Sequence, residues 1–177
     1  MSFWDSRAGL VTAGIIGLVL LLGLPQVVEL FTLLELTVYV IMAILALSLG
    51  LIWGFGGILC FGQAAFYGLG AYTYAVAAFN MTDMTVPFLL AIIVPAAFAA
   101  ALGYVMFYGR LSDVYMGVMT LVVTLIFFKF MNHTAGAEYA IGKALLGGFN
   151  GIPAIPPLHI PGDPTAVFYP EDVFYLA

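Results

Sequence analysis

The chain has 177 residues, of which 64% are hydrophobic and only 7% are charged, with a formal net charge of −5. Soluble domains carry about a quarter charged residues and about half apolar ones. A soluble fold of this length could not cover so much apolar surface. The composition therefore argues against a soluble enzyme and indicates a protein embedded in a membrane.

Long runs without charge predict five membrane segments, at about residues 9–24, 32–53, 58–79, 86–108 and 114–131. Asp, Glu, Lys and Arg are absent from 8–28, 36–82 and 84–109. A spanning helix needs about 20 mainly apolar residues, so the run 36–82 must hold two helices. Backbone groups cannot stay unpaired in hydrocarbon, and the period-two alternation of barrel strands is missing. We expect an all-α, polytopic membrane protein with a transmembrane region over residues 1–131.

The first segment resembles a signal peptide, because Arg7 precedes an apolar stretch. No small-x-small cleavage site follows it, which favours an uncleaved anchor. An N-inside orientation puts Arg7 and Arg110 in the cytoplasm, with Asp83 and the chain after Lys129 outside. Two basic residues then fall on each side, so the positive-inside rule alone does not decide. The loops nearest the first four helices favour N-inside.

The chain changes character after the fifth segment. Prolines recur from residue 153 onward, at a density that blocks regular helix. We expect an extended, ordered loop on the outer, periplasmic face over residues 132–172. Apolar residues return at 173–177, where a further helix is predicted to start. We therefore expect the chain to be a fragment, or a truncated product, of a longer protein.

A glycine-rich stretch over residues 53–72 is the most unusual local feature. Glycines weaken helices and let backbones approach closely in a membrane. We expect residues 54–62 to form an irregular break or a sharp bend, buried among other helices. Phosphate binding by Gly68-x-Gly70 has little support, because no strand precedes it. The glycines assigned to the helix break and to packing are Gly54, Gly56, Gly57, Gly62, Gly68 and Gly70.

Gln63 is the polar side chain placed most deeply in a charge-free run. An amide at membrane depth needs a partner, either a neighbouring helix or a solute. Tyr67 shares its helical face at i+4, and Cys60 and Tyr72 complete the candidate substrate pathway. Packing is the alternative reading for Gln63 and Cys60, and anchoring at the membrane interface is the alternative for Tyr67 and Tyr72. Cys60 is the only cysteine, and the two histidines lack metal-ligand spacing, so we expect no metal site and no catalytic residue.

This stretch resembles the signature of permease subunits from branched-chain amino acid ABC importers, the LivM type. Members carry a segment like G-Y-x-G-x-x-S-x-G-H/Q-A-A-F-x-G-x-G-A-Y. Phe55 stands where Tyr is usual, and Cys60 where Ser is usual, which removes a hydroxyl. The matching positions are Gly54, Gly57, Gly62, Gln63, Ala64, Ala65, Phe66, Gly68, Gly70, Ala71 and Tyr72.

Two later segments are similar to the same family. Residues 110–121 look like its R-L-x-G-x-Y-F-A-x-x-T-L segment, with Asp113 in place of Gly. Residues 147–152 look like its T-G-G-x-N/D-G-L/I segment, with Leu146 in place of Thr. The residues of this external-loop motif are Gly147, Gly148, Asn150 and Gly151. The resemblance covers roughly residues 30–177, the N-terminal part of a member.

The resemblance implies a permease that does no covalent chemistry itself. It implies a second permease subunit, two cytoplasmic ATPase subunits, a periplasmic substrate-binding protein and a location in the bacterial inner membrane. ATP would bind to the ATPase subunits, and this sequence contains no G-x-x-x-x-G-K-[ST] motif. We expect no cofactor bound by this chain and no nucleic acid. Urea or short amides are alternative substrates, and a non-transporting remnant or assembly protein is an alternative function.

Overall fold

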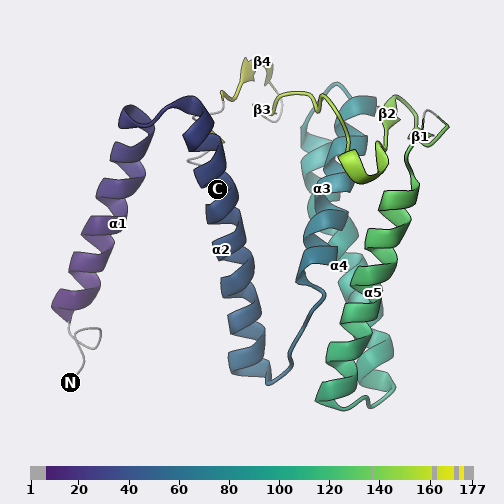
Figure 1. Cartoon of the computed structure of the whole chain (residues 1–177). Coiled ribbons are helices and arrows are strands. Elements are labelled where there is room, and N and C mark those ends of the chain that lie inside the picture. The colour runs from purple at the N-terminus through teal and green to yellow at the C-terminus, as the bar shows by residue number, and fades with distance from the viewer. Residues whose placement is uncertain (1–6, 137, 161–162, 170–171, 174–177) are drawn as a thin grey trace. The chain divides into compact units, whose positions relative to one another are not determined.

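The computed structural model describes residues 7–136, 138–160, 163–169 and 172–173. The described part contains five α-helices, one for each predicted segment (Figure 1). No strand occurs between residues 32 and 130, all of which are described. The expected all-α membrane fold is confirmed. The helices are α1 (Arg7–Val27), α2 (Leu30–Gly56), α3 (Gln63–Asn80), α4 (Thr85–Tyr108) and α5 (Asp113–His133).

Three of the described helices, α2, α4 and α5, are long and apolar enough to cross a membrane. Helix α3 is shorter, with 18 residues. At 1.5 Å per residue it is about 27 Å long, slightly less than the hydrocarbon thickness of about 30 Å. Helix α3 begins at Gln63, so the predicted start of this segment at about residue 58 is wrong by one to two turns.

The chain divides into two compact units, one formed by residues 1–43 with 168–177 and the other by residues 44–167. The first unit holds α1 and the beginning of α2. Leu33 and Thr37 are buried there, and the Thr37 hydroxyl donates to the Leu33 carbonyl 3.0 Å away. Asp172 and Val173 form a helical turn in this unit. Residues 174–177 of the predicted further helix lie outside the described residues.

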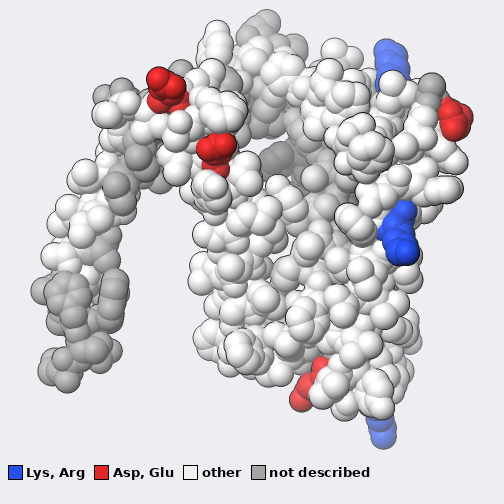
Figure 2. All heavy atoms as spheres, viewed as in Figure 1, with Lys and Arg blue, Asp and Glu red and all other residues white. Residues whose placement is uncertain are grey.

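The second unit is built on α3, α4 and α5, which an aromatic series joins. The Phe66 and Phe98 ring centroids are 6.1 Å apart, and those of Phe98 and Phe127 are 5.1 Å apart. Each pair joins two helices at distances typical of favourable aromatic contacts. In the view of Figure 2, most charged side chains of this unit lie toward the helix ends, and one basic side chain lies nearer the middle.

Helices α3 and α4 are in close contact at Gly70. A Cβ on this glycine would lie 3.0 Å from the Ala91 carbonyl oxygen and 3.5 Å from Pro95 Cγ. Pro95 has no N–H, so it cannot donate to the Ala91 carbonyl one turn earlier in α4. The expected packing role of Gly70 therefore has a structural basis, because a side chain would meet backbone.

The break between α2 and α3 lies at residues 57–62, which are not helical. Helix α2 continues through Gly54 and Gly56 and ends where Gly57 adopts φ +68°. The Gly57 N–H donates to the Trp53 carbonyl at 3.0 Å, the bond of a left-handed helix C-cap. The expected burial is wrong for the first part of the segment, because α2 still presents Phe55 with 91% of its surface exposed. Gly62, at the other end, is buried.

After α5 the chain is mostly extended, as expected, but it also forms short strand pairs that the sequence analysis did not predict. β1 (Ala140–Ile141) pairs antiparallel with β2 (Ala144–Leu145), and β3 (His159–Ile160) pairs antiparallel with β4 (Asp163–Val167). Between them lies a 3₁₀ turn, η2 (Gly148–Asn150). Prolines block regular helix from Pro153 onward, and the β1–β2 turn consists of the two residues 142–143.

Candidate functional site

The non-helical segment 57–62 is bonded to α5 by two threonines. The Phe61 N–H donates to Thr120 Oγ1 at 3.1 Å. The Thr124 hydroxyl lies 3.1 Å from the Phe61 carbonyl and 2.8 Å from the Thr120 carbonyl, so it can donate to either. Exposed backbone groups are tolerated at membrane depth only where protein pairs them. These hydroxyls therefore allow the chain to leave the helical conformation here.

Two glycines allow this segment to approach α5 closely. A Cβ on Gly117 of α5 would lie 3.1 Å from the Leu59 carbonyl oxygen. A Cβ on Gly62 would lie 3.3 Å from Thr120 Cβ and 3.0 Å from the Phe66 ring. The contact joins the glycine-rich stretch to the segment at 110–121, about 50 residues later in the sequence.

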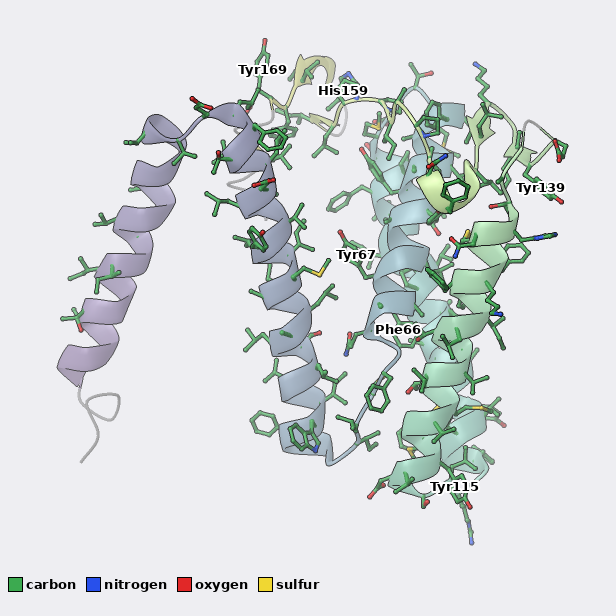
Figure 3. All side chains as sticks on the ribbon, viewed as in Figure 1. Phe66, Tyr67, Tyr115, Tyr139, His159 and Tyr169 are labelled. Atoms are coloured by element: carbon green, nitrogen blue, oxygen red, sulfur yellow. The ribbon has the colours of Figure 1, made fainter. Side chains whose placement is uncertain are left out.

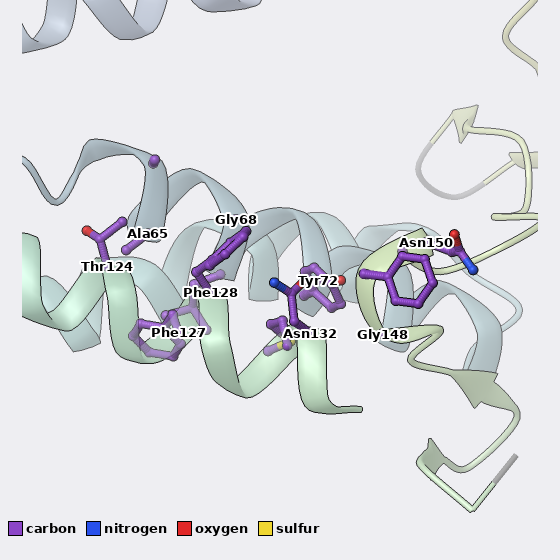
Figure 4. A pocket seen from close by; sticks show the side chains of 14 residues that line it. Ala65, Gly68, Tyr72, Thr124, Phe127, Phe128, Asn132, Gly148 and Asn150 are labelled. Atoms are coloured by element: carbon purple, nitrogen blue, oxygen red, sulfur yellow. The ribbon is translucent and has the colours of Figure 1, made fainter. Parts of the chain in front are cut away.

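A cavity of about 380 Å³ lies between α3, α5 and η2 (Figure 4). One wall comes from the glycine-rich stretch on α3 and another from the 147–152 segment, so residues about 80 positions apart face the same space. The lining residues are Ala64, Ala65, Gly68, Leu69 and Tyr72 of α3, Thr124, Phe127, Phe128, Met131 and Asn132 of α5, and Gly148, Phe149, Asn150 and Gly151.

Most polar side chains of this cavity lie toward one end, and Thr124 lies toward the other. Figure 4 shows Tyr72, Asn132 and Asn150 near η2, whereas Ala65, Phe127 and Thr124 lie farther along the helices. Among the described residues, no Asp, Glu, Lys or Arg lines the space. The η2 end of the cavity is thus uncharged but capable of hydrogen bonding. The other end is mainly apolar, and the hydroxyl of Thr124 there bonds backbone carbonyls.

The η2 wall requires its glycines. Gly147, Gly148 and Gly151 have φ values of +70°, +58° and +76°, which L-residues with a Cβ rarely adopt. A Cβ on Gly148 would lie 2.5 Å from the Ala135 Cβ, and one on Gly147 would overlap the Gly151 carbonyl. The Gly151 N–H donates to the Gly148 carbonyl at 3.1 Å, which closes the turn. The motif therefore encodes a tight turn seated against the end of α5.

The cavity includes only part of the predicted pathway set. Tyr72 lines it, together with Gly68 and the external-loop residues Gly148, Asn150 and Gly151. Gln63 is half-buried at the start of α3 and does not line it. Tyr67 points away from α5 (Figure 3) and is 44% exposed. Cys60 lies in the helix break, half-buried. A pathway role for these last three residues stays a prediction.

Sequence reasoning missed the α5 side of the site. Thr120 and Thr124 are spaced i, i+4 in an otherwise apolar helix, and Asn132 stands at its polar end. The i, i+4 spacing of two hydroxyls on one helical face was the available signal. Their partner, a non-helical backbone, becomes visible only when the break is placed beside α5.

The family model for the permease component of branched-chain amino acid transport systems matches residues 31–154. The chain belongs to this family. The match contains all three motif segments and ends 23 residues before the limit that the motifs suggested, residue 177. No curated protein and no solved structure matches the chain. The permease is a multi-pass membrane protein and a component of a transport system.

Proposed function

We propose that this permease is a subunit of an ATP-driven importer for branched-chain amino acids or related small solutes in the bacterial inner membrane. The cavity between α3, α5 and η2 would form part of the translocation pathway. One observation carries this proposal: two motif segments of the family, distant in the sequence, line one cavity.

The size and chemistry of the cavity suit a small solute with an apolar side chain. Its volume of about 380 Å³ lies within the range of about 300–1,000 Å³ for small-molecule sites. The aromatic and alanine end would receive a branched aliphatic side chain. Carboxamides offer both donors and acceptors, so Asn132 and Asn150 can bond a carboxylate or an ammonium group. Without a charged partner the binding would be weak, as passage through a pathway requires.

The other components follow from the family resemblance. A second permease subunit would complete the pathway, two cytoplasmic ATPase subunits would bind and hydrolyse ATP, and a periplasmic binding protein would deliver the solute. The carboxamides at the polar end would also suit urea or short amides, which keeps these solutes as a second candidate class. The experiment below distinguishes leucine-type from amide substrates by measuring the uptake of both.

The decisive experiment narrows the cavity without disturbing the fold. Gly68 lines the cavity, and a Cβ added there meets nothing within 4 Å. We expect Gly68→Leu to lower ATP-dependent uptake of radiolabelled leucine about tenfold or more in vesicles that contain all the subunits, because the side chain occupies the space that the solute needs. Ala101→Leu on α4, exposed and outside the cavity, is the matched control.

Each result of this experiment has a definite reading. Leucine uptake by Gly68→Leu at the level of the Ala101→Leu control would exclude the cavity from the pathway. If neither the unaltered transporter nor the Gly68→Leu variant transports leucine, and the variant takes up less urea than the unaltered transporter, the substrate belongs to the amide class. Lack of transport by the unaltered, fully assembled protein would favour a non-transporting role.

A further inference from the structure

Asn80, the last residue of α3, is bonded to the turn of the β1–β2 hairpin. Its Nδ2 donates to the carbonyl oxygens of Val76 at 2.8 Å and of Ile141 at 3.0 Å. Its Oδ1 accepts from the Lys143 N–H at 3.0 Å. A carboxamide has two N–H donors and one oxygen, so every polar atom of this side chain is engaged. Two of the three bonds reach across more than 60 residues of sequence.

The turn is shaped to receive this carboxamide. Gly142, between the two bonded residues, has φ +63°, and a Cβ there would lie 2.7 Å from Asn80 Cγ. Glycine with positive φ at the first position of a two-residue turn is a favoured hairpin arrangement. Both the conformation and the space at residue 142 therefore exclude a side chain while Asn80 is in place.

The hairpin leads directly into the wall of the cavity. Ala144 is fully buried and Leu146 is 8% exposed, and β2 contacts α3. The Leu146 N–H donates to the Tyr139 carbonyl at 3.0 Å, which prolongs the hairpin. The next residues are Gly147 and the η2 turn, whose residues line the cavity. A displacement of the hairpin would therefore displace η2.

We propose that Asn80 is a positioning residue for transport: its carboxamide fixes the β1–β2 hairpin on the end of α3 and thereby holds η2 as the wall of the cavity. The effect on transport rests on the proposed function. The fixing of the hairpin does not, and it can be measured without transport.

The first test measures the protection of a buried cysteine on the hairpin. Ala144→Cys is introduced with Cys60→Ser, so that the new thiol is the only one, and the chain is labelled in membrane vesicles with a maleimide. In the Asn80 protein we expect slow labelling. In Asn80→Ala we expect labelling about tenfold faster or more, because two hydrogen bonds between the hairpin and the helix are lost. Leu146→Cys is a second reporter of the same protection.

Two further variants separate the carboxamide from its surroundings. Asn80→Asp keeps the acceptor for the Lys143 N–H but loses the donor to Ile141, and we expect an intermediate labelling rate. Thr82 is exposed in the turn that follows Asn80. The reporter cysteine in the Thr82→Ala variant should be labelled as slowly as in the parent. Equal rates at both reporters in Asn80 and Asn80→Ala would overturn the proposal.

The second test measures uptake by the assembled transporter. We expect uptake to be highest in the Asn80 parent, lower in Asn80→Asp and lowest in Asn80→Ala. Uptake by Thr82→Ala should equal that of the parent. Faster labelling with unchanged uptake in Asn80→Ala would overturn the positioning role in transport. Failure of the proposed function would appear differently, as unchanged uptake in Gly68→Leu.

Discussion

At the scale of single residues, the glycines of this permease serve two different purposes. Gly68 lines the cavity, and a Cβ there would meet open space. Gly148 has a left-handed conformation, and a Cβ there would lie 2.5 Å from the Ala135 Cβ. The sequence presents each as a glycine of a family motif, but only the structure separates a glycine that leaves space for a solute from one that allows a turn.

The contrast predicts opposite effects of the same substitution. Gly148→Ala should destabilise the protein by about 1–2 kcal/mol or more, because the left-handed conformation alone costs that much and Ala135 must also move. Gly68→Ala should be neutral or stabilising by up to about 1 kcal/mol, since alanine is the better helix former. Thermal melting of the two variants in detergent would check this. Equal melting temperatures would contradict our account of the η2 turn.

At the scale of elements, the five helices could be predicted because charge-free runs and hydrocarbon thickness set their number and length. The strand pairs were missed because each strand pair depends on only a few residues, and the β1–β2 turn depends on a carboxamide more than 60 residues away. Only part of the cavity lining was predicted, because some of its residues come together only through tertiary packing. Tyr72 and the external-loop motif carry a family signature, whereas Thr124 and Asn132 acquire their place only through the packing of α5.

The helix break predicts a specific sensitivity in α5. Thr120→Val preserves shape but leaves the Phe61 N–H without its acceptor, which should cost roughly 1–3 kcal/mol. Thr37→Val is the matched control, because Thr37 is equally buried and its hydroxyl bonds only its own helix. We expect a clearly lower melting temperature for Thr120→Val than for the control. Similar values would mean that Phe61 finds another partner.

At the scale of the whole molecule, the turns between the helices of the second unit lie at opposite ends of α4. The chain after α5 meets the end of α3 through Asn80, so the turn at residues 81–84 and the hairpin share one end. The turn at residues 109–112 lies at the other end of α4. The predicted N-inside orientation would place Arg110 in the cytoplasm and the η2 end of the cavity at the outer face.

Single cysteines can verify this orientation. With Cys60→Ser as the parent, Thr82→Cys and Ser112→Cys are both exposed turn positions. A membrane-impermeant thiol reagent added to intact cells should label residue 82, and residue 112 only after the cells are opened. The reverse result would invert the orientation, and labelling of both from one side would refute the crossing by α4.

The non-helical segment beside Thr120 and Thr124 also sets a length. Six residues, 57–62, can extend over at most about 20 Å, whereas the same six in a helix would rise only about 9 Å. Continuing α3 backward through them would shorten the link between α2 and α3 by roughly 10 Å. The hydroxyls of Thr120 and Thr124 thus hold this segment outside helix α3, and two turns of helix are the upper limit of the movement that their release would allow.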